Sequence, residues 1–151
     1  MIIRTASCDE VATLTELVFE SKRHWGYDEE FMQQCRSELV VREDDVAKGM
    51  VFVAADEVNN EALGVFVLKM SSDDEAELDM LFVSPLSMGE GVGAVLLSHA
   101  FNVARGSGRT VVRVESDPFA AAFYEHHGGD LAGTSTSVST GRELPVYEFR
   151  L

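Results

Sequence analysis

The spacing of hydrophobic residues along the chain alternates between the period of a strand and that of a helix. β-Branched and aromatic runs with a period of two predict strands, and apolar residues that recur three and four positions apart predict helices. Strands are predicted over residues 1–6, 50–57, 62–71, 76–85, 109–116, 129–139 and 145–151. Helices are predicted over residues 7–24, 29–39, 92–106 and 118–128. The predicted order is therefore β-α-α-β-β-β-α-β-α-β-β.

Local signals at the ends of the helices support these boundaries. Ser7, with Glu10 three residues later, is typical of a capping box, and Gly128 suits the end of the last helix. The three strands between residues 50 and 85 follow one another without a helix, which predicts an antiparallel meander. We therefore expect an α+β fold, with a mixed but mostly antiparallel sheet flanked by helices, in one domain that spans residues 1–151.

The composition of the chain limits the kinds of molecule that we expect it to bind. The chain carries 12 Lys and Arg against 26 Asp and Glu, a formal net charge of −14. Nucleic-acid binding needs a basic face, so we expect no nucleic-acid partner. No apolar run approaches the roughly 18 residues of a membrane helix, and the first residues lack the features of a signal peptide. We therefore expect no membrane association and a cytoplasmic location. The two cysteines and four histidines lack the spacing of a metal site, so we expect no metal.

The segment PLSMGEGVGAVLLSHAF, residues 85–101, contains an unusual series of glycines. Gly89, Gly91 and Gly93 lie between a predicted strand and a predicted helix. Glycine allows a ligand to approach the backbone closely. A helix N-terminus adds free N–H groups and a partial positive charge. Such a loop binds an anion such as a phosphate without a basic side chain.

Two nucleotide-binding loops share this geometry but differ in sequence. A P-loop needs Lys and then Ser or Thr after its last glycine, whereas Gly93 is followed by AVL, so a P-loop is excluded. A dinucleotide-binding loop needs G-x-G-x-x-G and an acidic residue about 20 positions later. Glu115 lies near that position, but the spacing here is G-x-G-x-G and only one βαβ unit is predicted. A nucleotide-dependent oxidoreductase therefore stays a weaker alternative.

The segment FVSPLSMGEGVGAVLL resembles the acetyl-CoA loop of the GNAT superfamily of N-acetyltransferases, whose pattern is V-x-P-x-x-[RQ]-G-x-G-x-G-x-x-L-L. A second segment, SDPFAAAFYEHHGG, resembles the family pattern N-x-x-A-x-x-F-Y-x-x-x-G-F, with Asp117 in place of asparagine and Gly129 in place of phenylalanine. SKRHWGYDEEFMQQC and GRELP are similar to segments of a bacterial subgroup. The resemblance implies a single-domain GNAT-like fold, acetyl-CoA as the acyl donor and direct transfer to a primary amine.

The resemblance also implies which residues contact the donor. They are Leu81, Phe82, Val83, Met88, Gly89, Glu90, Gly91, Val92, Gly93, Ala94, Asp117, Phe119, Ala120, Phe123 and Tyr124. If the preceding strand carries the family's bulge, the N–H groups of residues 81–83 bind the pantetheine arm. Met88 stands where the family has arginine or glutamine, and a methionine neither donates a hydrogen bond nor balances charge. Because backbone amides remain, we expect binding to persist but to lose about 1.5–3 kcal/mol.

Transfer to an amine needs a base for the ammonium proton and an acid for the departing thiolate. Glu77 and Asp79 lie two apart in a predicted strand, so both should face the same side. Leu78, Met80 and Phe82 would then cover the opposite side. The resemblance implies that Glu77 holds the position of the base, with Asp79 as the alternative, and that Tyr124 is the acid that protonates the thiolate of CoA.

The acceptor is expected near the connection between the first two helices. His24, Trp25 and Tyr27 lie there, and an aromatic pair near acidic residues suits a cation. Arg142, in the loop before the last strand, is expected at the same mouth, where it would bind either a carboxylate of the acceptor or a partner subunit. The expected partner is the amine of a small molecule or peptide, and the resemblance suggests a homodimer. A GNAT-fold protein that senses acyl-CoA without catalysis, favoured by the two departures Met88 and Asp117, is the main alternative.

Overall fold

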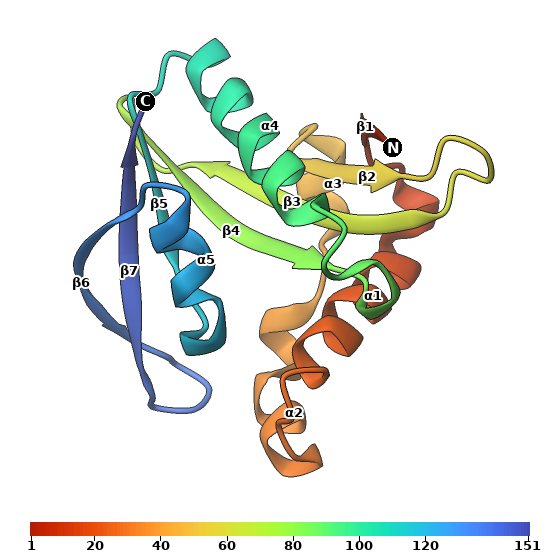
Figure 1. Ribbon diagram of the computed structural model, residues 1–151, viewed down its shortest axis with the longest axis horizontal. Coiled ribbons are helices and arrows are strands. Elements are labelled where there is room, and N and C mark those ends of the chain that lie inside the picture. The colour runs from red at the N-terminus through yellow and green to blue at the C-terminus, as the bar shows by residue number, and fades with distance from the viewer.

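Seven strands form one mixed sheet in the computed structural model, which describes residues 1–151. Their order across the sheet is β1-β2-β3-β4-β5-β7-β6, and every neighbouring pair is antiparallel except β4 and β5 (Figure 1). The strands are β1 (Ile2–Thr5), β2 (Val51–Ala55), β3 (Ala62–Met70), β4 (Glu75–Val83), β5 (Val111–Glu115), β6 (Asp130–Thr136) and β7 (Glu143–Arg150). The predicted α+β class and the mostly antiparallel sheet are confirmed.

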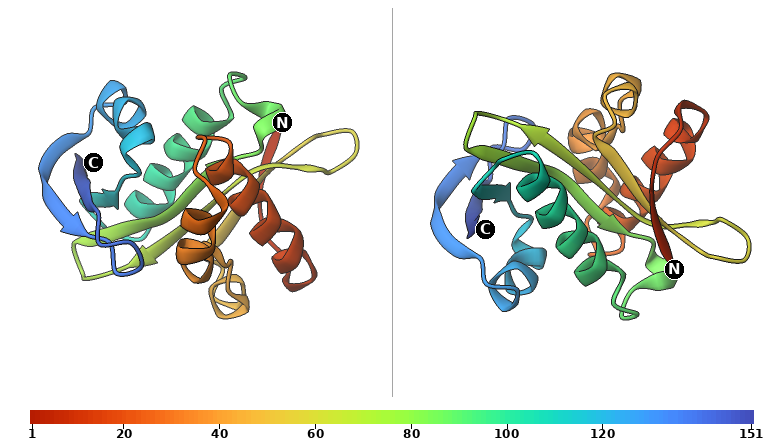
Figure 2. Two further views of the ribbon diagram at one scale, coloured as in Figure 1. Left: turned by 90° about the horizontal axis from the view of Figure 1, so that it is seen from below. Right: turned by 90° about the horizontal axis from the view of Figure 1, so that it is seen from above.

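Helices lie on both sides of this sheet. They are α1 (Val11–Arg23), α2 (Glu29–Cys35), α3 (Glu43–Ala47), α4 (Val92–Gly106) and α5 (Ala121–His126). Helices α1, α2 and α3 lie on one side, and α4 and α5 lie on the other (Figure 2). The short helix α3 was not predicted, because five residues with a single buried side chain, Val46, show no helical period.

Two hydrophobic cores result, one on each side of the sheet, and strands β3 and β4 contribute alternate side chains to both. The core under α1 contains Leu14, Val18, Met32, Val53, Val65, Val67 and Met80 among its buried residues. The core under α4 contains Phe66, Leu68, Leu78, Leu96, Val112, Tyr124 and Phe149 among its own. Each large side chain buried in this way stabilises the fold by about 1.5–3 kcal/mol. The sheet centre is therefore rigidly held from both sides.

The one parallel pair of the sheet is short. Strands β4 and β5 pair only between residues 75–77 and 111–113. Beyond Glu77 and Arg113 the two strands diverge (Figure 1). The rest of β4 keeps its pairing with β3 but has no partner on its other edge. The sheet therefore opens into a gap at its middle.

A β-bulge at Asp79 changes which way β4 directs its side chains. In the pairing with β3, Leu78 is opposite Leu68 and Met80 is opposite Val67, so Asp79 has no partner residue. The prediction that Leu78 and Met80 share a face is therefore wrong: Leu78 packs in the core under α4 and Met80 in the core under α1. The extra residue reverses the alternation of the strand at this point.

Candidate functional site

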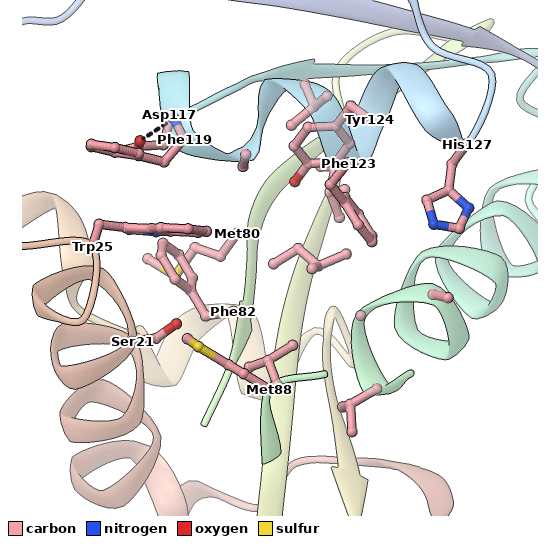
Figure 3. A pocket seen from close by; sticks show the side chains of 18 of the residues that line it. Ser21, Trp25, Met80, Phe82, Met88, Asp117, Phe119, Phe123, Tyr124 and His127 are labelled. Atoms are coloured by element: carbon pink, nitrogen blue, oxygen red, sulfur yellow. Dashed lines mark hydrogen bonds between the residues drawn. The ribbon is translucent and has the colours of Figure 1, made fainter. Parts of the chain in front are cut away.

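A cleft of about 650 Å³ occupies the gap between β4 and β5. It runs from the connection between α1 and α2 to the space between α4 and α5 (Figure 3). Its side under α1, which we call the α1 half, is lined by Ser21, His24, Trp25, Asp79, Met80, Phe82, Glu115 and Phe119. Its side under α4, the α4 half, is lined by Leu81, Val83, Ser87, Gly89, residues 91–94, Ala120, Phe123, Tyr124 and His127. The halves meet along the free edge of β4.

The free edge of β4 presents backbone donors to the cleft. Ser84 donates to the carbonyl of Leu63 at 2.8 Å, and residues bonded to the partner strand alternate along an antiparallel pair. Met80 and Phe82 are in phase with Ser84 and so direct their N–H groups to β3. Leu81 and Val83 therefore direct theirs into the cleft. The predicted bulge precedes them, at Asp79.

The glycine loop forms a second group of backbone donors. Gly89 and Gly91 adopt φ angles of 81° and 83°, in the left-handed region where a side chain is unfavourable. Gly91 is the N-cap of α4 and no side chain caps the helix. None of the amides of residues 88–94 donates a hydrogen bond within the chain. These N–H groups and the helix dipole make the loop an anion-binding site.

Gly93 brings the two helices of the α4 half together. A Cβ atom at Gly93 would lie 3.3 Å from the ring of Phe123, so glycine permits the close approach of α4 and α5. The ring of Phe123 in turn contacts the imidazole of His127, with centroids 4.6 Å apart. No lysine or arginine lines the cleft. His127 is thus the one side chain of the α4 half that is able to carry positive charge.

Tyr124 is 5% exposed and its hydroxyl points into the cleft (Figure 3). The hydroxyl makes no hydrogen bond within the chain, in contrast to that of Tyr147, which donates to Glu125 at 2.8 Å. Burial raises the pKa of Tyr124 far above its usual range. The phenol is therefore protonated at neutral pH and free to donate its hydrogen to a bound group.

Three carboxylates lie where β4 and β5 diverge. Asp79 and Glu115 line the cleft, whereas Glu77 lies behind it and is not part of the lining. Lys69 is 3.5 Å from Asp79, and the hydroxyl of Ser135 donates to Glu115 at 3.0 Å. Burial raises the pKa of Glu77, and the negative charges of Asp79 and Glu115 raise it further. A carboxylate with a raised pKa holds a proton more strongly and is a better base near neutral pH.

A polar network closes the cleft beside the α1–α2 connection. The hydroxyl of Tyr27 donates to Asp117 at 2.9 Å, and Arg142 donates to the same hydroxyl at 2.9 Å. Lys22 lies 3.2 Å from Asp117, which also accepts from the N–H of Phe119. Burial raises the pKa of Tyr27 to about 12, so it stays a donor. Lys22 and Arg142 both pair with the negative charge of Asp117. These two cations explain why a carboxylate stands at position 117, where the family pattern has asparagine.

Aromatic and thioether side chains dominate the α1 half. The rings of Trp25 and Phe119 are stacked, with centroids 5.4 Å apart and planes 7° from parallel. The side chain of Met88 points from the glycine loop toward Ser21 and Phe82 (Figure 3). Met88 therefore contributes to the apolar lining of the α1 half rather than to the anion-binding loop.

The structure brings most of the predicted site residues into one cleft. Of the predicted set, Glu77, Glu90, Tyr27 and Arg142 do not line it. The cleft also contains residues that the sequence analysis did not assign, namely Ser21, Leu78, Met80, Ser87, Val114, Glu115 and His127. One signal was available for Ser21: it lies three residues after Val18 on the buried stripe of α1, where a serine is unusual.

Comparisons with known proteins agree with this geometry. The family model described as "Acetyltransferase (GNAT) domain" matches residues 47–128, more than half of the chain. The match covers the meander, the glycine loop, α4, β5 and α5. No curated protein matches the sequence. The antiparallel meander leaves β4-α4-β5 as the only βαβ unit, which argues against a dinucleotide-binding fold.

Solved structures resemble the whole chain at low sequence identity. The PaiA N-acetyltransferase of Thermoplasma acidophilum, in complex with coenzyme A, is 21% identical with a TM-score of 0.82, covering 99% of this chain and 98% of that one. A GCN5-related N-acetyltransferase of Rhodopseudomonas palustris is 20% identical with a TM-score of 0.77, covering 99% and 95%. YncA of Salmonella typhimurium, solved with its cofactor acetyl-CoA, is 23% identical with a TM-score of 0.71, covering 100% and 94%. These likenesses confirm the fold.

Proposed function

Because the chain belongs to the GNAT acetyltransferase family, we propose that it transfers the acetyl group of acetyl-CoA directly to the nitrogen of a primary amine. The observation that supports this most strongly is the composition of the cleft. One half offers unpaired backbone donors, and carboxylates lie across from a free phenol at the point where the strands diverge. This arrangement supplies an anion site, a base and an acid within a single cavity.

The α4 half fits a donor that carries phosphates on a flexible amide-containing arm. The amides of residues 88–94 are placed to bind the phosphates. The N–H groups of Leu81 and Val83 are placed to bind amide carbonyls of the arm. His127 adds the one titratable cation on this side. Because the amides carry no net charge, we expect donor binding to depend weakly on ionic strength.

The acid and the base act on opposite sides of the transfer. The amine nitrogen forms the new C–N bond, the C–S bond breaks, and the sulfur leaves as a thiolate. We assign Tyr124 to protonate that thiolate. We assign Glu77, whose pKa is raised, as the base that takes the ammonium proton, with Asp79, which lines the cleft, as the alternative. Neither Cys8, which is exposed, nor Cys35, which is buried, lines the cleft, so we propose no acetyl-cysteine intermediate.

Calorimetry with acetyl-CoA, followed by single-turnover kinetics, tests this proposal. Saturable binding to the wild type and loss of turnover in Tyr124→Phe are expected, by about 100-fold or more if the phenol acts as a general acid. Tyr147→Phe is the matched control, because Tyr147 is equally buried and its hydroxyl lies outside the cleft. Normal turnover in Tyr124→Phe would remove the assigned acid, and absence of acetyl-CoA binding would remove the function.

A second candidate function is sensing of acyl-CoA without catalysis. Met88 favours it, because a basic or amide side chain at that position is part of the family pattern. Acetyl-CoA that binds tightly and stays intact in the presence of every amine offered would support this alternative.

A homodimer and a cytoplasmic location remain our predictions for this protein. No helix has the length and apolar character needed to cross a bilayer. Light scattering on the purified chain, with and without acetyl-CoA, measures the mass directly and tests the dimer.

A further inference from the structure

The α1 half of the cleft has the chemistry of a binding site for a flat apolar group. Trp25 and Phe119 stack there although they are 38% and 54% exposed, so both rings present apolar surface to the cleft and to solvent. Met80 and Phe82 extend this surface along β4. Figure 3 shows Met88 closing it from below, beside Ser21. Parallel rings and thioethers favour a planar apolar partner.

This surface is on the opposite side of β4 from the donor contacts. The unpaired amides of the glycine loop, Phe123 and His127 all belong to the α4 half. The bulge at Asp79 produces this separation, because it turns Met80 toward α1 while Leu81 and Val83 face α4. The α1 half is therefore free to receive the acceptor.

The charges around this surface select against an acidic acceptor. Asp79 and Glu115 line it, and no lysine or arginine does. Lys22 and Arg142 lie behind the lining and are engaged with Asp117, and Lys69, also outside the lining, lies 3.5 Å from Asp79. A carboxylate on the acceptor would meet the negative charges of Asp79 and Glu115 and find no lysine or arginine in the lining, whereas an ammonium group would find Asp79 and Glu115.

Resting on the proposed function, we propose that the acceptor is a primary amine carried on a flat, uncharged apolar body, an arylalkylamine in chemical class. The ammonium group binds at Asp79 and Glu115, beside the reacting atoms. The ring binds against Trp25, Phe119 and Phe82. The free hydroxyl of Ser21, which has no partner within the chain, faces the same space. A carboxylate on the acceptor has no lysine or arginine to meet in this lining, and a second ammonium group on the body would lie against the apolar rings.

The test compares three amines with acetyl-CoA as donor: phenethylamine, phenylalanine and 1,4-diaminobutane. Phenylalanine differs from phenethylamine only by its carboxylate, so the pair isolates that charge. We expect kcat/KM for phenethylamine to exceed both others by about 100-fold. Products are measured by mass spectrometry, because the exposed Cys8 thiol reacts with thiol reagents.

Variants locate the binding surface. Trp25→Ala is expected to raise KM for phenethylamine about tenfold while leaving the Kd of acetyl-CoA unchanged, and Phe119→Ala is expected to raise KM to a similar extent. Leu131→Ala is the control, since Leu131 is an exposed apolar residue outside the cleft. Glu115→Arg is expected to reverse the preference toward phenylalanine. Trp25→Phe, which keeps an aromatic ring, should restore most of the affinity.

The outcomes separate this inference from the proposed function. Preference for phenylalanine or the diamine would overturn it, as would failure to acetylate phenethylamine by an enzyme that binds acetyl-CoA. In both cases the proposed acetyltransferase function survives as long as some other amine is acetylated. Loss of acetyl-CoA binding, or transfer to no amine at all, removes both.

Discussion

The phenol of Tyr27 donates its hydrogen to the carboxylate of Asp117 at 2.9 Å, and so joins the connection before α2 to the turn before α5 across 90 residues of sequence. Arg142 donates to the same phenol from the β6–β7 hairpin. Three separate segments therefore meet at one hydroxyl. The side chain of Asp117 is only 13% exposed, so the carboxylate depends on these partners for its charge.

Removing either member of this contact should lower stability. In Tyr27→Phe, Asp117 loses a donor and Arg142 loses an acceptor, and we expect the free energy of unfolding to fall by about 1–2 kcal/mol. In Asp117→Asn, Lys22 and Arg142 lose their counter-charge, and a larger loss of up to about 3 kcal/mol is expected. Urea denaturation measures both. An unchanged midpoint in Asp117→Asn would mean that the two cations are fully solvated.

The pH dependence of turnover should report Glu77. A base must be ionised to accept a proton, so turnover falls as pH drops through its pKa. Burial raises the pKa of Glu77, which places this fall above the ordinary range of a glutamate. Glu77→Gln should abolish the fall together with most of the turnover.

Asp79→Asn provides the companion measurement for that profile. This substitution removes a negative charge that raises the pKa of Glu77, so turnover should fall at a lower pH than it does in the wild type. If instead Asp79→Asn abolishes turnover while Glu77→Gln retains it, Asp79 is the base.

The same carboxylate should cost stability at neutral pH. The folded state holds a proton on Glu77 more strongly than the unfolded chain does, because its folded pKa is raised. The contribution of Glu77 to the free energy of unfolding is therefore fully present below its pKa in the unfolded chain. It is lost as pH rises through its pKa in the folded protein. We expect Glu77→Gln to raise the melting temperature at pH 7 and to have no effect near pH 3. A lower melting temperature at pH 7 would contradict this sign.

The glycine loop offers a matched pair of substitutions. Gly91 and Gly108 lie before and after α4 with φ angles of 83° and 79°, and a Cβ atom at either would meet open space. Alanine at either position should cost about 1–2 kcal/mol of stability through backbone strain. Only Gly91→Ala should also weaken acetyl-CoA binding, by about tenfold or more. Equal affinities in the two variants would show that the loop does not bind the donor.

Met88 has two interpretations, as a residue that binds the donor or as part of the apolar lining of the α1 half. The family pattern places a donor-binding side chain here, whereas Figure 3 shows the thioether directed to Ser21 and Phe82. Met88→Ala should therefore raise KM for the amine several-fold and change the Kd of acetyl-CoA little. Titration calorimetry and steady-state kinetics on one preparation measure both quantities.

The sequence predicts the order of the elements and the position of the glycine loop because both depend on local spacing. The bulge is different. Residues 77–80, ELDM, alternate polar and apolar, and the apolar residues LFV follow, so nothing in the run marks Asp79 as the residue that β3 leaves unpaired. The side of the sheet toward which a side chain points could therefore be predicted correctly for Glu77 and Leu78 but not for Met80.

Contacts between segments that are far apart in the sequence could not be predicted either. Tyr27 and Arg142 were expected in the acceptor pocket, but the structure places them in a network around Asp117, behind the lining. That network depends on the β6–β7 hairpin approaching α2, which no local pattern reports. Glu115 drew attention only as the acidic residue expected after a dinucleotide-binding loop, and its place in the cleft follows from the divergence of β4 and β5.

The divergence of β4 and β5 has a consequence for hydrogen exchange. Met80 and Phe82 give their amides to β3, while Leu81 and Val83 leave theirs without a partner in the interior of a sheet. Deuterium uptake along this strand should therefore alternate from one residue to the next in the free protein. A donor that binds the free edge acts as the missing strand, and its arrival should make the exchange rates of all four residues alike.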